Sequence, residues 1–147
     1  MDAYSYARQH LFGPLEISHT AWLSSPEGHS MGHIGLYLTS RDLAKIAVCL
    51  LNGGVYGQRQ VIPEPWLQDA FAVQTSGYSA YGDYGYQFWN GTMSGQPFKL
   101  AHGHGGQQML LLPKLDAAVI FTAETAVSRW KHPRRLVEQY LIPAMAP

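Results

Sequence analysis

The residues best suited to chemistry in this sequence lie in the run His102-Gly103-His104-Gly105-Gly106-Gln107. Imidazoles can bind metal ions or move protons near neutral pH. Glycines let the backbone approach a ligand closely and present N–H groups to it. The run joins two segments with the composition of strands, so His102 and His104 would share one face if it were extended. Three roles fit it: a packed entry to a strand, a metal site, or a strand beside a catalytic centre.

A zinc site in this run would need more ligands than its two histidines, because zinc is held by at least three His, Cys, Asp or Glu side chains. No cysteine or acidic residue is close to His102 or His104 in the sequence, so a third ligand would have to be distant, such as His132. A phosphate loop is excluded, since no Gly-Lys-Ser/Thr signature is present. We therefore expect no metal and no cofactor, and keep a histidine-based metal-binding domain as an alternative.

A covalent mechanism would need a nucleophile with an adjacent base. The single cysteine, Cys49, lies in an apolar helical run and is expected to be buried. No Gly-x-Ser-x-Gly elbow is present. One Ser-x-x-Lys occurs at Ser128 and Lys131, but Pro133 disfavours helical backbone at His132, and with it the helix that would align the pair. We interpret this segment as a loop leading into the last helix.

The composition limits the remaining classes of function. The 147 residues, 46% hydrophobic and 14% charged, are typical of one modest globular domain. The formal net charge is zero and no basic stripe is visible, so no nucleic-acid partner is expected. No apolar run approaches the ~18 residues of a membrane span. No secretion signal is recognisable, and the sequence assigns no compartment.

Four helices are predicted. In the clearest, Thr39 is the N-cap and Asp42 stands at the spacing of a capping box. Asn52-Gly53-Gly54 ends it, because glycine readily takes the left-handed conformation. Another begins near Pro65, which suits a first helical turn. The other two are expected over Ala3–Leu11 and Pro133–Ile142, the latter with Leu136, Val137, Tyr140 and Leu141 as its apolar side.

Strands are predicted between the helix that begins near Pro65 and the C-terminal helix. The segment Tyr84–Trp89 alternates like a strand, and Asn90-Gly91 is a turn signal. Further strands are a run through Phe98 and Leu100 into His102, then Gln108–Leu112, then Ala117–Ala123. Pro113–Asp116 should turn the last two into an antiparallel hairpin. The predicted fold is α+β: an antiparallel sheet with a packed C-terminal helix and one open edge.

Five segments, in this order, resemble the C-terminal half of the β-lactamase-related serine hydrolases, a family that includes class C β-lactamases, D-Ala-D-Ala carboxypeptidases and family VIII esterases. They are Ala7–Ile17, Gly35–Lys45, Leu51–Trp66, Tyr84–Trp89 and Gly103–Gly106. The resemblance covers nearly all of residues 1–147. It implies a partial serine β-lactamase/DD-peptidase-like fold, and hydrolysis of a β-lactam, peptide or ester through an acyl-enzyme.

The resemblance also assigns roles to the glycine-rich run. The third motif of this family is commonly Lys-Thr-Gly or His-Thr-Gly, which places His104, Gly105 and Gly106 at its three positions. The backbone N–H of Gln107 would then be one of two oxyanion-hole donors. Gly105 departs from the usual threonine, which leaves esterase and amidase activities as open as β-lactamase activity.

The nucleophile motifs of the family, Ser-x-x-Lys and then Tyr-x-Asn or Ser-x-Asn, precede the first resembling segment and are absent from those positions here. We therefore expect these residues alone to be inactive and to act on a small acyl substrate only when completed by an N-terminal portion. Self-association through the open sheet edge is also expected. The alternative is a non-catalytic binding or interaction module, which would use that edge and the aromatic segment Tyr78–Tyr86.

Overall fold

The computed structural model describes residues 1–123 and 133–145. The chain forms two compact units, Met1–Pro63 and Glu64–Pro147. Within the described ranges, no helix is both long and apolar enough to cross a membrane. Ser128, Lys131 and His132 lie outside the described residues, so the interpretations placed on them stay predictions.

The first unit contains helices and two small ladders. Its elements are helix α1 (Ala3–Ala7), π-helical turn η1 (Arg8–Phe12), strands β1 (Ala21–Trp22) and β2 (Leu36–Tyr37), helix α2 (Ser40–Leu51), and strands β3 (Val55–Tyr56) and β4 (Arg59–Gln60). Phe12, Leu15, Ile17 and Cys49 form its buried core. Cys49 is fully buried as predicted, and burial raises the pKa of its thiol.

Helix α2 begins and ends where the sequence predicts. The Thr39 hydroxyl accepts from the Asp42 N–H at 3.1 Å, and the Asp42 carboxylate accepts from the Thr39 N–H at 3.2 Å. This reciprocal pairing satisfies two backbone donors that the helix leaves free. After the helix, Gly54 has a φ of +89°, and a Cβ there would meet the Ile62 carbonyl oxygen. Only glycine fits at this position, where the chain after helix α2 passes close to Ile62.

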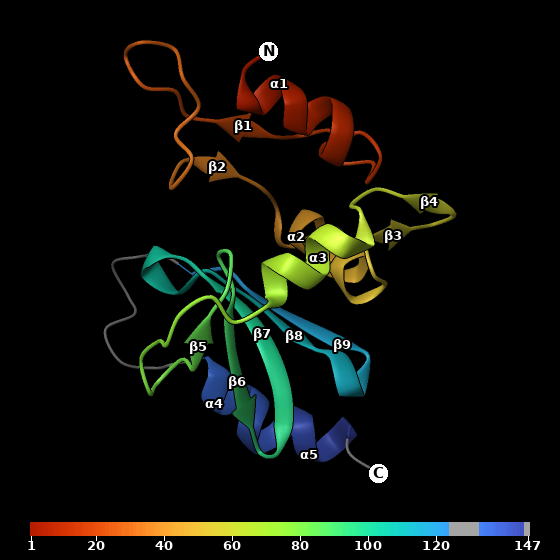
Figure 1. Cartoon of the computed structure of the whole chain (residues 1–147), viewed down its shortest axis with the longest axis vertical. Coiled ribbons are helices and arrows are strands. Elements are labelled where there is room, and N and C mark those ends of the chain that lie inside the picture. The colour runs from red at the N-terminus through yellow and green to blue at the C-terminus, as the bar shows by residue number, and fades with distance from the viewer. Residues whose placement is uncertain (124–132, 146–147) are drawn as a thin grey trace. The chain divides into compact units, whose positions relative to one another are not determined.

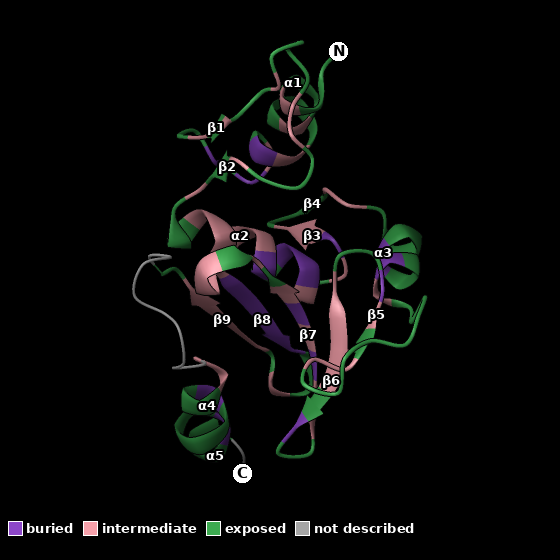
Figure 2. Cartoon of the chain, turned by 90° about the vertical axis from the view of Figure 1, so that its left-hand side faces the viewer, coloured by how far each residue is buried: buried purple, intermediate pink, exposed green. Residues whose placement is uncertain are grey.

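The second unit is built on one antiparallel sheet in the order β5-β6-β7-β8-β9 (Figure 1). Its strands are β5 (Asp83–Tyr84), β6 (Trp89–Met93), β7 (Gln96–His102), β8 (Gln108–Leu112) and β9 (Ala117–Phe121). The predicted hairpin is confirmed, with Gln108 opposite Phe121 and Leu112 opposite Ala117. Strand β9 ends two residues before the predicted limit, and β7 and β8 are the most buried strands (Figure 2).

The prediction for Tyr84–Trp89 is wrong. The chain turns between β5 and β6, with Gln87 at a φ of +65°, and Asn90-Gly91 lies inside β6 rather than in a turn. A Cβ on Gly91 would come within 2.7 Å of the Phe98 ring, so this glycine serves close packing. The tight turn between β6 and β7 is Ser94-Gly95, both at positive φ, as two-residue hairpins prefer.

The C-terminal helix covers one face of the sheet (Figure 1). It comprises α4 (Arg134–Leu136), π-helical η4 (Val137–Leu141) and α5 (Ile142–Met145). The predicted apolar side is confirmed only for Val137, because Leu136, Tyr140 and Leu141 are 55%, 64% and 39% exposed. The wider π-helical turn places Val137 and Ile142, five residues apart, against the sheet.

Helix α3 (Glu64–Phe71) forms where Pro65 predicts it and buries Leu67 and Ala70. Lys99 of β7 links the end of this helix to the sheet. Its ammonium donates to the Phe71 carbonyl at 3.2 Å and to the Asn90 side-chain oxygen at 2.6 Å. Burial lowers the pKa of Lys99, so these two acceptors compensate for lost water.

Candidate functional site

The glycine-rich run forms a turn rather than a strand. Strand β7 ends at His102, and residues His104–Gly106 form the 3₁₀ turn η2. Gly105 and Gly106 have φ values of +77° and +91°, which side chains rarely tolerate. The expectation that His102 and His104 share one strand face is therefore wrong, because the backbone changes direction between them.

Gln107 follows this turn and is held in place from two sides. Its carbonyl accepts from the Gly103 N–H at 2.7 Å, which closes the turn. Its side-chain amide donates to the Ala123 carbonyl and accepts from the Ala123 N–H at 3.1 Å. The side chain thus extends the β8–β9 ladder beyond Phe121. The Gln107 backbone N–H, the predicted oxyanion donor, directly follows this turn.

The two histidines of the run have different surroundings. The His104 side chain is exposed at the turn. The His102 side chain is also exposed, but its ring centre lies 5.2 Å from that of Tyr81, and partial burial together with the nearby Arg134 charge lowers the pKa of His102. His102 therefore belongs to the aromatic packing of the sheet face. Residues 1–123 and 133–145 contain no group of three potential metal ligands, and His132, the third ligand of the metal alternative, lies outside them.

Gln108 is a buried polar side chain in strand β8, and no motif in the sequence marks it. It is 2% exposed and lies opposite His102 on β7. Neither its side-chain oxygen nor its nitrogen has a hydrogen-bond partner in the described parts of the chain. Buried amides without partners are rare in folded proteins, which makes Gln108 an unusual feature next to the turn.

The tyrosines of the segment Tyr78–Tyr86 contact other aromatic rings, although Tyr78 and Tyr86 are 72% and 47% exposed. The rings of Tyr78, Tyr81 and Tyr84 lie 5.9, 5.2 and 4.5 Å from the ring of Trp89. Tyr86 lies 5.8 Å from Trp66 of α3. Packing is therefore supported as the role of the half-buried Tyr81 and Tyr84, and Tyr81 also borders a groove.

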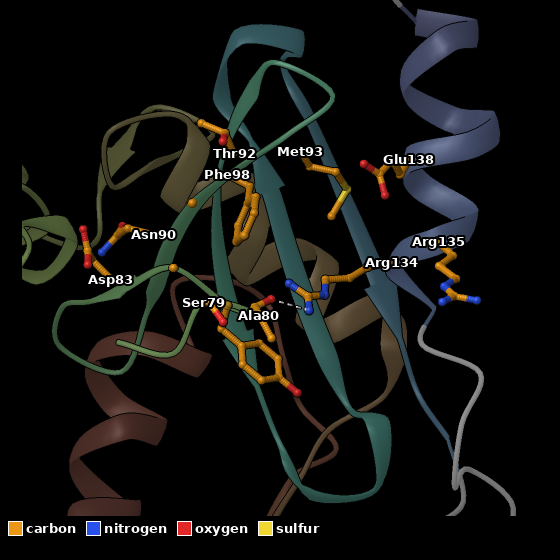
Figure 3. A pocket seen from close by; sticks show the side chains of 13 residues that line it. Ser79, Ala80, Asp83, Asn90, Thr92, Met93, Phe98, Arg134, Arg135 and Glu138 are labelled. Carbon is orange, nitrogen blue, oxygen red and sulfur yellow. Dashed lines mark hydrogen bonds between the residues drawn. The ribbon is translucent and has the colours of Figure 1, made fainter. Parts of the chain in front are cut away.

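The groove, of about 620 Å³, lies between the sheet face, the segment Ser79–Asp83 and the start of α4 (Figure 3). Phe98 and Met93 supply apolar wall, and Glu138 stands on the helix side. The Arg134 guanidinium lies 4.7 Å from the Tyr81 ring centre and donates to the Ala80 carbonyl at 2.8 Å. The turn His104–Gly106 is not part of its lining, so groove and turn are separate features.

The Arg134–Tyr81 contact was missed by sequence analysis. Its partners are more than fifty residues apart, and neither lies in a recognisable motif. An arginine in the first turn of a helix ordinarily indicates only a solvated surface. Nothing local in the sequence could have paired them.

No known family model matches this sequence, and no curated protein matches it. Solved structures do match. One of them, named "Putative 6-aminohexanoate-dimer hydrolase from Bacillus anthracis", has a TM-score of 0.72 and 20% sequence identity, covering 95% of this chain and 37% of that chain. This chain thus spans little more than a third of the length of its neighbour. At this identity the likeness shows the fold, and it confirms the predicted α+β class with an antiparallel sheet and a packed C-terminal helix.

Proposed function

We propose that this chain supplies the oxyanion side of a serine hydrolase site that cleaves a β-lactam, peptide or ester through an acyl-enzyme. The observation that carries the proposal is the turn His104–Gly106 followed by Gln107, whose side chain is fixed to Ala123. Gly105 and Gly106 both have positive φ and carry no side chain that would cover the backbone there. The fold shared with a hydrolase supports the same reading.

The reaction requires a serine from outside these 147 residues, in the same polypeptide or in another. Its hydroxyl oxygen attacks the substrate carbonyl carbon and gives up its proton, the bond to the leaving group breaks, and the leaving group takes that proton. Water then attacks the acyl carbon, the acyl–serine bond breaks, and the serine regains its proton. In both steps the carbonyl oxygen becomes negatively charged, and the Gln107 N–H donates to it. Loss of one such donor typically costs ~100–1,000-fold in rate.

His104 acts at the edge of this site. Its exposed imidazole can orient the substrate or transfer a proton to the leaving group. The two roles predict different effects of His104→Ala on kcat/KM. The variant should lower kcat/KM only modestly if the imidazole orients substrate. A loss above ~1,000-fold would indicate proton transfer.

The test is complementation with the N-terminal portion of a β-lactamase-related hydrolase that carries Ser-x-x-Lys and Tyr-x-Asn. The two chains should associate and hydrolyse a chromogenic β-lactam or a nitrophenyl ester. Gly106→Val should then lower kcat/KM most, because a side chain there crowds the carbonyl beside the donor. Gly95→Val is the matched control, since Gly95 also has positive φ, +74°, but lies in the β6–β7 turn. Association without activity on any acyl substrate would contradict the proposal.

A further inference from the structure

Gln107 uses its side chain as a substitute for backbone pairing. The β8–β9 ladder ends at the pair Gln108 and Phe121. Beyond that pair, the planar amide of Gln107 donates to the Ala123 carbonyl and accepts from the Ala123 N–H at 3.1 Å. In an antiparallel ladder, a hydrogen-bonded pair of residues exchanges the same two bonds. One side chain therefore takes the place of a backbone residue opposite Ala123.

The backbone of Gln107 is held as well. The Gly103 N–H donates to the Gln107 carbonyl at 2.7 Å. A Cβ on Gly103 would come within 3.2 Å of the Gln107 Cβ, so the absence of a side chain at Gly103 lets the two residues lie directly against each other. Gly103, Gln107 and Ala123 all belong to the second unit. Three hydrogen bonds within one compact unit thus fix the side chain and the carbonyl of Gln107.

The two residues before Gln107 are both glycines. Gly105 and Gly106 have φ values of +77° and +91°, and glycine has more backbone freedom than any other residue. An N–H that follows two glycines can point in several directions unless another contact fixes it. A donor to a developing oxyanion is effective when it is aimed in advance, because reorientation during the reaction would add to the barrier. The site therefore needs a restraint from outside the turn.

We infer that the side-chain amide of Gln107 is a positioning group that fixes the direction of the residue's own backbone N–H. Because the peptide unit is planar, an N–H whose Cα, side chain and carbonyl are held can turn only about the N–Cα bond. The catalytic consequence rests on the proposed function. There, a misaligned donor lowers kcat and leaves KM nearly unchanged, since the charge that it stabilises is absent from the bound substrate.

The first experiment measures the ¹⁵N order parameter of the backbone amide at position 107, and it needs no activity. We expect about 0.85 in the unmodified chain and below about 0.6 in Gln107→Met, which keeps the length of the side chain and loses both hydrogen bonds. Gln107→Asn should resemble Gln107→Met, because its amide is one methylene too short. Gln108→Met is the matched control and should leave position 107 unchanged, since the Gln108 amide has no hydrogen bond within the described residues. Equal order parameters in the unmodified chain and Gln107→Met overturn the inference.

The second experiment measures kcat and KM in the complex with the complementing N-terminal portion, per folded complex so that lost stability does not count as lost rate. Gln107→Met and Gln107→Asn should lower kcat by about 10–100-fold at nearly constant KM, because small errors of position cost up to about 100-fold. Gln108→Met should keep kcat within about twofold. An active complex in which Gln107→Met also keeps kcat within about twofold overturns the inference. A complex that is inactive with the unmodified chain contradicts the proposed hydrolase function instead, and the order parameters then decide whether the side chain positions the N–H.

Discussion

Replacing Gln108 by methionine should stabilise the fold. Gln108 is 2% exposed, and neither of its side-chain amide atoms has a partner in the described structure. An unsatisfied buried polar group costs about 1–3 kcal/mol. Methionine has a similar unbranched shape and adapts to irregular surroundings. Because part of the gain is offset by imperfect packing, we expect an increase of about 1–2 kcal/mol in the free energy of unfolding.

The neighbouring glutamine provides the matched control. Gln107→Met removes the two hydrogen bonds to Ala123 and should destabilise the chain by about 1–2 kcal/mol. Both variants are measured by urea unfolding. An unchanged slope of the unfolding free energy against urea concentration shows that the unfolding reaction is the same. If Gln108→Met is as destabilising as Gln107→Met, the Gln108 amide has a partner in solution and the reasoning from its burial is refuted.

Three further predictions concern activity, pH and packing. The isolated chain should show no enzymatic turnover of β-lactams or nitrophenyl esters, since an oxyanion donor without a nucleophile retains little catalysis; turnover abolished by Ser128→Ala would overturn this. Because the pKa of His102 is lowered in the folded state, stability should fall as the pH drops below about 6.5, where the unfolded chain takes up a proton first. In thermal melts from pH 7 to 5, the melting temperature of His102→Phe should fall less than that of the unmodified chain. If the melting temperature depends on pH equally in both, the lowered pKa of His102 is contradicted. Gly91→Ala should cost about 1–3 kcal/mol by crowding the Phe98 ring, measurable by urea unfolding; a neutral result would show that the ring moves aside.

Features fixed by neighbouring residues could be predicted from the sequence. The capping box of α2 depends on Thr39 and Asp42, three residues apart, and the β8–β9 hairpin depends on the turn between adjacent strands. The glycine-rich run was singled out because its glycines free the backbone. In each case the atoms that decide the structure are close in the chain.

Features set by tertiary packing could not be predicted. Asn90-Gly91 has the composition of a turn, but the Phe98 ring needs the space that Gly91 leaves. The apolar side of the last helix was predicted at a period of 3.6 residues, whereas the π-helical turn buries Val137 and Ile142 instead. The prediction that His102 and His104 share one strand face is wrong because the left-handed glycines turn the backbone.

The central claim is that the Gln107 N–H donates to a developing oxyanion, and one measurement tests it directly. The chain is labelled with ¹⁵N, combined with the complementing N-terminal portion, and treated with a boronic acid that forms a tetrahedral adduct on the serine. We predict that the Gln107 amide proton moves strongly downfield as it gains this charged acceptor. The Gly103 amide, already bonded to the Gln107 carbonyl, should move little. Inhibition of the complex with the Gln107 resonance unchanged would contradict the assignment.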